Sequence, residues 1–211
     1  MFVTQIAELS KSRSRIFVDD EFAFVLHKGE LRLYHVAVGE ELPLEDYRTI
    51  MEQVLPKRAK LRAMSLLKSR EYTTKQLYDK LKRGDYPENV IREALDYVEG
   101  FHYIDDLRYA VNYISGHESV RSRRRIEQDL LNRGIDRAVL EQAWQEWEAQ
   151  GGIQDEETMI KELFRKRGYD PENADRKEIQ RMGAFLMRRG FSGESVRKAL
   201  FTDMFGDYDH V

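Results

Sequence analysis

Apolar side chains recur at helical spacing on both sides of a glycine in the stretch 120–148. Ile126 and Leu130 are four residues apart and share one helix face, and Gly134 ends that helix because glycine adopts a left-handed conformation without a Cβ penalty. Asp136 is a suitable N-cap for the next helix. A second apolar stripe follows at helical spacing: Val139, Leu140, Ala143, Trp144 and Trp147. The pattern predicts a helix, a break and a helix, which need neighbours to bury both stripes.

The same pattern occurs in two other places. Five apolar positions of 126–143 recur without a gap 49 residues earlier and 56 residues later. The matching residues are Leu77, Leu81, Tyr86, Ile91 and Ala94, and then Met182, Leu186, Phe191, Val196 and Ala199. Gly190 repeats the glycine of the break, whereas the first copy has Asp85 there, directly after Gly84. A further helical segment precedes each copy, at 60–68, 106–114 and 156–167, so we predict three tandem three-helix units rather than three unrelated hairpins.

The first 55 residues have a different pattern. Short β-prone runs cover 2–7, 15–18 and 22–26, and the acidic triplet 19–21 between the last two indicates a hairpin turn. A short helix is expected over 28–36 with Gly39 at its end, and Pro43 opens the next apolar helical stripe. Pro56 should kink or divide the helix that leads into the first repeat and move Leu55 out of the α region.

The predicted fold is mainly α: three tandem three-helix repeats in an elongated array, preceded by a small N-terminal β-meander with a short helix. The predicted domain boundaries are 1–55 for the meander, 56–104, 105–150 and 151–205 for the repeats, and 206–211 for a disordered tail. The glycine pair in 150–154 suggests a loose joint between the second and third repeats.

Composition limits the class of protein. The 211 residues are 35% charged and contain no cysteine, so disulfides and thiolate metal sites are excluded, which fits a reducing cytoplasm. No apolar run approaches the roughly 20 residues that cross a bilayer, and the start lacks the pattern of a signal peptide. We expect a cytoplasmic monomer. The formal net charge of −3 argues against a generic nucleic-acid binder, although residues 57–104 carry 11 basic and 7 acidic side chains.

Several motifs resemble the RecX family of recombination regulators. They are Leu66-Leu-Lys-Ser-Arg70 followed by Thr74-Lys-Gln-Leu77, Gly100-Phe-His-Tyr-Ile-Asp-Asp106-Leu-Arg-Tyr109, Leu131-Asn-Arg-Gly-Ile135, and Leu186-Met-Arg-Arg-Gly-Phe191. The resemblance covers about residues 57–201 and implies three tandem three-helix repeats. It also implies binding to the RecA recombinase and to the RecA–DNA filament, with restraint of filament growth, ATP hydrolysis and strand exchange, and thus a role in recombination, DNA repair and the SOS response. The chain departs from the family at Asp85, where the first repeat normally has glycine, and in its acidic balance.

The sequence contains no catalytic constellation. The five histidines are scattered without metal-ligand spacing, and no phosphate-binding glycine loop is present. Asp105 and Asp106 fit a helix cap better than a cation site. We therefore predict a protein that is not an enzyme and has no cofactor or metal.

Basic residues are the candidate contact residues. Helical geometry places Arg121 and Arg125 of the second repeat, and Lys177 and Arg181 of the third, at equivalent exposed positions. The full predicted set adds four residues: Arg70, Arg124, Arg188 and Arg189. These cations either contact the phosphates or acidic surface of a nucleoprotein filament, or are solvated side chains in pairs such as Arg125–Asp129 and Arg123–Glu127.

A second function remains open at this point: a stand-alone DNA-binding regulator whose repeats act as helix-turn-helix readers. The stretch 137–148 argues against it, because this expected recognition helix carries Glu141, Glu146 and Glu148 and only one arginine. Weak binding to free single- or double-stranded DNA is compatible with either function.

Overall fold

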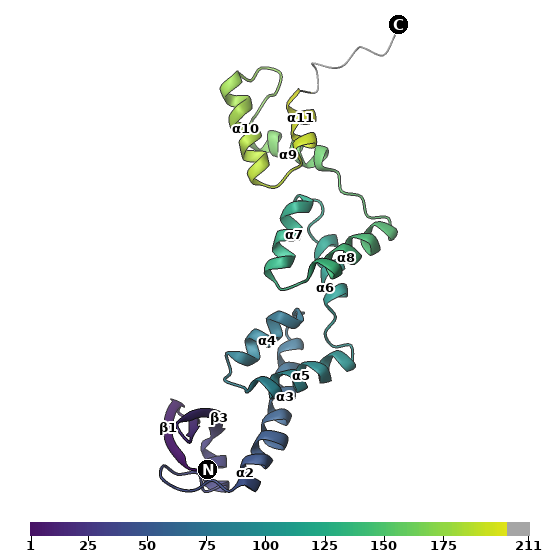
Figure 1. Ribbon diagram of the computed structural model, residues 1–211. Coiled ribbons are helices and arrows are strands. Elements are labelled where there is room, and N and C mark those ends of the chain that lie inside the picture. Colours follow the sequence, from purple (N-terminus) through teal and green to yellow (C-terminus); the bar gives the residue numbers. More distant parts are fainter. Residues whose placement is uncertain (202–211) are drawn as a thin grey trace. The chain divides into compact units, whose positions relative to one another are not determined.

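The computed structural model describes residues 1–201, so the expected tail at 206–211 lies outside the described residues. The chain divides into two compact units, the first from Met1 to Asp105 and the second beginning at Asp106 (Figure 1). The first unit contains a small sheet and repeat one, and the second contains repeats two and three. The prediction of a mainly α protein with three three-helix repeats after an N-terminal β-meander is confirmed.

The sheet is an antiparallel meander of β1 (Val3–Ser10), β2 (Arg13–Val18) and β3 (Glu21–His27), in that order. Val18 pairs with Glu21, so the second hairpin has a two-residue turn of Asp19 and Asp20, with φ of 49° and 69°. Turns of this kind require positive φ at both positions, and aspartate is one of the few non-glycine residues that tolerate it. The acidic hairpin turn is confirmed.

Short helical segments follow the sheet: α1 (Lys28–Leu33), α2 (Leu44–Thr49) and the π-helical turn η1 (Ile50–Val54). The prediction that Gly39 ends α1 is wrong, because that helix ends at Leu33 and His35 takes the left-handed conformation, with φ of 48°. Gly39 lies in the next loop, where its N–H donates to the carbonyl of Val3 at 2.8 Å.

Pro56 is accommodated inside a helix. It is the second residue of α3 (Leu55–Leu67), and Leu55 stays helical at φ −68° and ψ −44°, contrary to the prediction. The turn before the proline is η1, where the wider π geometry makes room for the proline ring and its missing amide. The chain is therefore helical from Leu44 to Leu67.

Repeat one consists of α3, α4 (Thr74–Lys82) and α5 (Glu88–Gly100). Thr73 caps α4: its hydroxyl accepts from the amide of Gln76 at 3.1 Å, and Gln76 Oε1 accepts from the amide of Thr73 at 3.3 Å. Pro87 is the N-cap of α5. The apolar faces of these helices share one core with the sheet residues Ile16 and Phe24, which are fully buried.

Repeats two and three each have a core of their own. Repeat two consists of α6 (Asp106–Ser115), α7 (Arg123–Asn132) and α8 (Arg137–Ala149), and repeat three of α9 (Glu156–Arg167), α10 (Arg176–Arg188) and α11 (Gly193–Phe201). Asp136 caps α8 as predicted, accepting from the amide of Val139 at 2.9 Å. The repeat-defining apolar positions are buried in all three copies, except Tyr86, which is half-buried.

The break in each repeat has a residue with positive φ: 60° at Asp85, 87° at Gly134 and 87° at Gly190. Asp85, which replaces the glycine of the other two repeats, therefore still adopts the left-handed conformation. Aspartate tolerates this conformation better than most residues do. Asp85 also accepts hydrogen bonds from Arg15 of β2, at 3.0 Å from Nε and 2.8 Å from Nη2. The side chain that glycine lacks is used here to hold the sheet against repeat one.

The joint between repeats two and three is held by hydrogen bonds, contrary to the expectation of a loose hinge. The amide of Gly152 donates to the carbonyl of Trp147 at 3.1 Å. Gln154 Nε2 donates to the carbonyls of Arg121 at 2.7 Å and Glu118 at 3.3 Å. A Cβ on Gly152 would lie 2.2 Å from the indole of Trp147, so the close contact explains the second glycine of the pair.

Candidate anion-binding interface

Arg121 lies outside α7, although the sequence prediction placed it on a helix face with Arg125. Ser122 is the N-cap of α7 and accepts a hydrogen bond from the amide of Arg125 at 3.4 Å, so the helix begins one residue later. In repeat three, the cap of α10 is Asp175, which lies three positions before the residue that corresponds to Ser122. Lys177 is therefore inside its helix, and its predicted equivalence to Arg121 is wrong.

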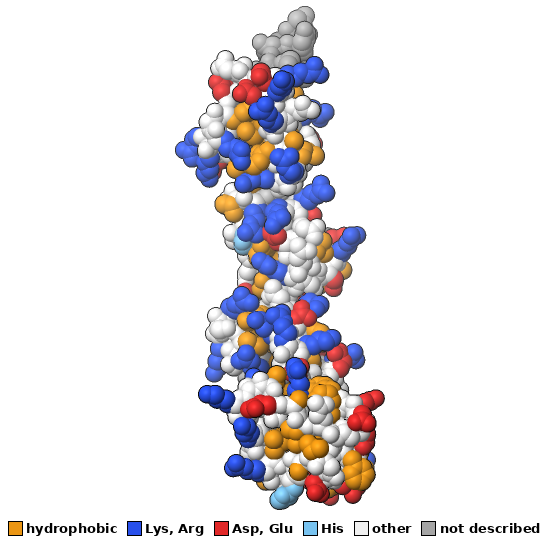
Figure 2. Space-filling view, turned by 90° about the vertical axis from the view of Figure 1, so that its left-hand side faces the viewer, with side chains coloured by type: hydrophobic (Ala, Val, Ile, Leu, Met, Phe, Trp, Pro, Cys, Tyr) orange, Lys and Arg blue, Asp and Glu red, His pale blue; other side chains and the backbone are white. Residues whose placement is uncertain are grey.

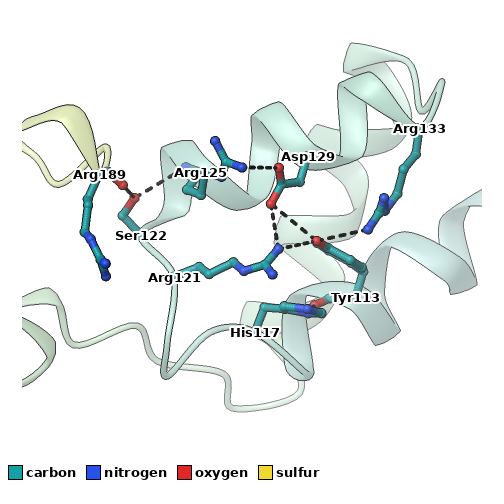
Figure 3. Close-up of polar contacts among 8 residues, drawn as sticks. All are labelled: Tyr113, His117, Arg121, Ser122, Arg125, Asp129, Arg133 and Arg189. Carbon is teal, nitrogen blue, oxygen red and sulfur yellow. Dashed lines mark hydrogen bonds and ion pairs between the residues drawn. The ribbon is translucent and has the colours of Figure 1, made fainter.

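Asp129 binds two of the predicted arginines (Figure 3). Its Oδ2 accepts from Arg121 Nη1 at 2.6 Å, and its Oδ1 pairs with Arg125 Nη2 at 3.3 Å. Arg121 Nη1 also donates to the hydroxyl of Tyr113 at 2.6 Å, and the ring of Tyr113 stacks on His117 at 4.0 Å. The Asp129 side chain is only 12% exposed, so this carboxylate fixes both guanidinium groups from the protein side.

Repeats two and three meet at a buried contact between α7 and the end of α10. Ser122, which is 1% exposed, donates from its hydroxyl to the carbonyl of Arg189 at 2.8 Å (Figure 3). Gly190 follows with φ of 87°, and a Cβ there would lie 2.8 Å from Ser122 Oγ and 3.4 Å from the amide of Arg125. Glycine at this position therefore satisfies both the backbone conformation and the close approach of the two repeats.

Four arginines line a cleft of about 320 Å³ beside this contact. We call it the arginine cleft, and its lining consists of Val120, Arg121, Ser122, Arg125, Arg188, Arg189 and Phe191. The lining contains no carboxylate, and the neighbouring Asp129 is already shared between two of the four guanidinium groups. The cleft consequently has an excess of positive charge and planar donors of the type that bind phosphate in a bidentate manner.

A line of cations on α10 leads to the arginine cleft. Lys177, Arg181 and Arg188 lie within about 40° of one another around the helix axis and span about 16 Å along it. The buried residues Met182 and Leu186 lie on the opposite side of the helix. We call these three exposed cations the α10 stripe, and none of them forms an ion pair with any residue from 1 to 201. Figure 2 shows Lys and Arg side chains gathered on this face of the second unit, over α7 and α10.

The remaining predicted residues lie elsewhere. Arg124 borders a different, wider groove of about 940 Å³ whose lining includes five carboxylates. Arg189, by contrast, lines the arginine cleft, and its guanidinium lies 4.9 Å from the ring centre of Phe185. Arg70 belongs to the first unit and lies over the ring of Tyr72 at 4.4 Å. The structure thus brings together six members of the predicted set: four arginines line the cleft, and Arg181 and Lys177 continue the line along α10.

Two features of this site were missed by sequence reasoning. The contact of Ser122 with Arg189 joins residues 67 positions apart, and local pattern does not report such a pair. Tyr113 was overlooked as a polar partner of Arg121, because it sits in the apolar period of α6. A serine directly before a run of helix-forming residues is a usual N-cap, and that signal alone would have placed the start of α7 correctly.

The part of the chain that the structure describes contains neither a candidate metal site nor a candidate membrane-spanning helix. Within residues 1–201, no group of three or more histidine, aspartate and glutamate side chains is arranged to hold a metal ion. No helix in that range combines the length and the apolar character that crossing a bilayer requires. The arrangement on α7 and α10 is suited to holding an anion.

Comparisons with known proteins agree with this architecture. Family models match three segments: the first RecX three-helix domain over residues 59–97, the second over 105–143 and the third over 154–200. Regulatory protein RecX of Caldanaerobacter subterraneus subsp. tengcongensis is 31% identical over 95% of this chain and 98% of its own length. The regulatory protein RecX of Clostridioides difficile is 25% identical, with 98% of both chains covered.

Solved structures support the same fold. A crystal structure of regulatory protein RecX covers 96% of this chain at a TM-score of 0.61 and 24% identity. That of RecX from Lactobacillus salivarius covers 70% of this chain and 95% of its own, at a TM-score of 0.58. With three matching domain models and a relative similar over nearly the whole length, this chain belongs to the RecX family of regulatory proteins.

Proposed function

We propose that this protein is a non-enzymatic regulator that binds the RecA recombinase on its nucleoprotein filament and restrains ATP hydrolysis and strand exchange. Membership in a family of regulatory proteins supports a regulatory role. The observation that carries the proposal on this chain is the arginine cleft together with the α10 stripe. Six cations gather there, and the single carboxylate of Asp129, shared by Arg121 and Arg125, is their described ion-pair partner. Such a surface fits the regularly spaced phosphates of a filament.

In this proposal the stripe and the cleft have different roles. Exposed lysine and arginine side chains gain affinity by releasing counterions from phosphates, about 0.7 to 0.9 ions per contact. The cleft presents the guanidinium groups of Arg121 and Arg125, which Asp129 holds in place, so less side-chain entropy is lost on binding there. The stripe supplies long-range attraction, and the cleft supplies a fixed docking point.

The alternative function, a stand-alone helix-turn-helix reader of duplex DNA, is less well supported. The third helix of repeat two, α8, would be its recognition helix, and Glu141, Glu146 and Glu148 are all exposed on it. Carboxylates on that surface repel the phosphates on either side of a major groove. We do not assign this function to the chain.

A titration distinguishes the two functions. The labelled protein is added to RecA filaments on single-stranded DNA, to RecA without DNA, and to naked duplex, and the ATPase rate of the filaments is measured in parallel. The proposal expects the tightest binding to filaments, with inhibition that saturates over the same concentration range. Equal or tighter binding to naked duplex, with an unchanged ATPase rate, would contradict it.

A further inference from the structure

The first unit has a second cationic surface, on residues that the sequence comparison of repeats did not select. A groove of about 740 Å³ lies where the sheet meets α3 and α4. Five basic side chains line it: Arg13, Arg58, Arg62, Lys80 and Arg83. They come from the start of β2, from successive turns of α3 and from the end of α4. We call it the sheet groove.

The sheet groove has little negative charge to balance these cations. Asp85 is the only carboxylate in its lining, and Arg15 already occupies it with hydrogen bonds of 2.8 and 3.0 Å. Arg58 is paired with Glu30 and donates to the carbonyl of Val25 at 3.0 Å. The other four basic residues of the lining have no ion pair with any residue in the described range 1–201. A low-dielectric hollow lined by one sign of charge concentrates counterions of the opposite sign.

Tyr86 lies among these arginines and adds an aromatic surface. Burial raises the pKa of the Tyr86 phenol, while Arg58, Arg62 and Arg13 act in the opposite direction, as expected if guanidinium groups lie on several sides of it. The ring lies close to the backbone of Gly84, where a Cβ would be 3.1 Å from it. The glycine before Asp85 therefore leaves space for the aromatic ring of the groove.

The walls of the groove are held in a fixed relation. Sheet and repeat one share a single hydrophobic core, and the pair of Arg15 with Asp85 joins β2 to the break of repeat one. A groove built in this way exists before a ligand arrives, which lowers the entropy lost on binding. Aspartate in place of the usual glycine thus contributes directly to the shape of this surface.

We propose that the sheet groove binds the sugar–phosphate backbone of single-stranded nucleic acid. Arginine guanidinium groups match phosphodiester oxygens in a bidentate geometry. A positive groove combined with an aromatic side chain is the usual arrangement of sequence-independent single-strand binding. A flexible single strand follows a recessed groove, whereas the phosphates of a rigid duplex reach its rim. This site is separate from the proposed filament contact, since its residues all belong to the first unit.

The test uses the full chain and a fluorescein-labelled oligo(dT), with fluorescence anisotropy at low salt and no RecA present. The groove variant is Arg62→Glu/Lys80→Glu/Arg83→Glu. Its control, Arg48→Glu/Lys57→Glu/Lys68→Glu, changes the net charge equally at exposed cations of the first unit outside the groove. We expect the groove variant to bind at least about tenfold more weakly than the control. For the milder Arg62→Gln/Lys80→Gln/Arg83→Gln, the salt slope should fall by about 2, at roughly 0.7 ions per contact.

Circular dichroism melting of each variant checks that the first unit stays folded. If the glutamate variant does not stay folded, the glutamine variant takes its place in the binding measurement. Equal losses in the groove and control variants would overturn the proposal. So would displacement of oligo(dT) by polyglutamate at equal charge, which would indicate an acidic protein ligand, or equally tight binding of a duplex of the same length. Because RecA is absent, this result is independent of filament regulation.

Discussion

Replacing Gly190 by alanine tests the contact that joins repeats two and three. Gly190 has φ of 87°, and an added Cβ would lie 2.8 Å from Ser122 Oγ. The variant must therefore move Ser122 away from the carbonyl of Arg189, to which it donates at 2.8 Å. Gly151 provides a matched control, because its φ is 89° and a Cβ there would meet no atom within 4 Å.

The two alanine variants should differ in magnitude. Both variants are destabilised by the backbone strain of an L-residue in the left-handed conformation, about 1 to 2 kcal/mol. Gly190→Ala additionally loses a buried hydrogen bond, worth about 0.5 to 1.5 kcal/mol. We therefore expect Gly151→Ala to destabilise the second unit by about 1 to 2 kcal/mol, and Gly190→Ala by about 1.5 to 3.5 kcal/mol.

Tryptophan fluorescence during urea unfolding measures this difference. The chain has two tryptophans, Trp144 and Trp147, and both lie in the core of repeat two. A lower midpoint for Gly190→Ala than for Gly151→Ala means that a change in repeat three reaches repeat two through the Ser122 contact. Equal midpoints, or a lower midpoint for the control, would refute the reasoning.

Three further predictions concern single contacts. Asp129→Asn removes the negative charge that neutralises two arginines of the cleft but keeps an oxygen that can still accept from Arg121. Filament binding should therefore tighten by a few-fold in a titration, and weaker binding would count against the cleft. Gly152→Ala places a methyl against Trp147 and should cost about 1 to 3 kcal/mol through overpacking, measured by thermal melting against the Gly151 control. A double-mutant cycle of Arg15→Ala and Asp85→Ala should give a coupling of about 0.5 to 1 kcal/mol, and zero coupling would show that the pair does not hold the sheet.

The repeats could be predicted from sequence because their determinants are local and periodic. Ile126 and Leu130 fall on one helix face, Gly134 supplies a left-handed residue, and Asp136 caps the helix that follows. The apolar face and the left-handed break recur in each copy. Asp85 stands where the other two copies have glycine, yet it keeps the positive φ of the break. The first copy therefore matches the others in backbone conformation although the residue type differs.

Features that depend on distant contacts or on competition between neighbouring residues were not predictable in the same way. Helix α1 ends at Leu33, with His35 in the left-handed conformation, whereas the pattern had placed the end of this helix at Gly39. A π turn absorbed Pro56, so the expected disruption of the helix did not reach Leu55. Helical spacing also failed at Arg121, because the local cap at Ser122 starts α7 one residue later and leaves Arg121 outside the helix.

The candidate site shows the same division. Sequence alone indicated the exposed arginines of repeats two and three correctly except for Arg121, which is half-buried. It also listed the pair of Arg125 with Asp129 as an alternative. The structure contains that pair, at 3.3 Å, and adds Arg121 to it. Counting charges in the sequence does not show that the Asp129 carboxylate pairs with two guanidinium groups. Nor does it show that the α10 stripe has no ion-pair partner among the described residues.

The salt dependence of filament binding tests the central claim most directly. The variant Lys177→Ala/Arg181→Ala/Arg188→Ala removes the α10 stripe, and Arg137→Ala/Lys161→Ala/Arg197→Ala removes three exposed cations of the second unit on other helices. Alanine is the best helix former, so both variants should keep their helical content. If the stripe contacts phosphates, the slope of the logarithm of affinity against the logarithm of salt concentration should fall by about 2 to 3 for the first variant, with little change for the second. Equal slopes in the wild type and the stripe variant would contradict the claim.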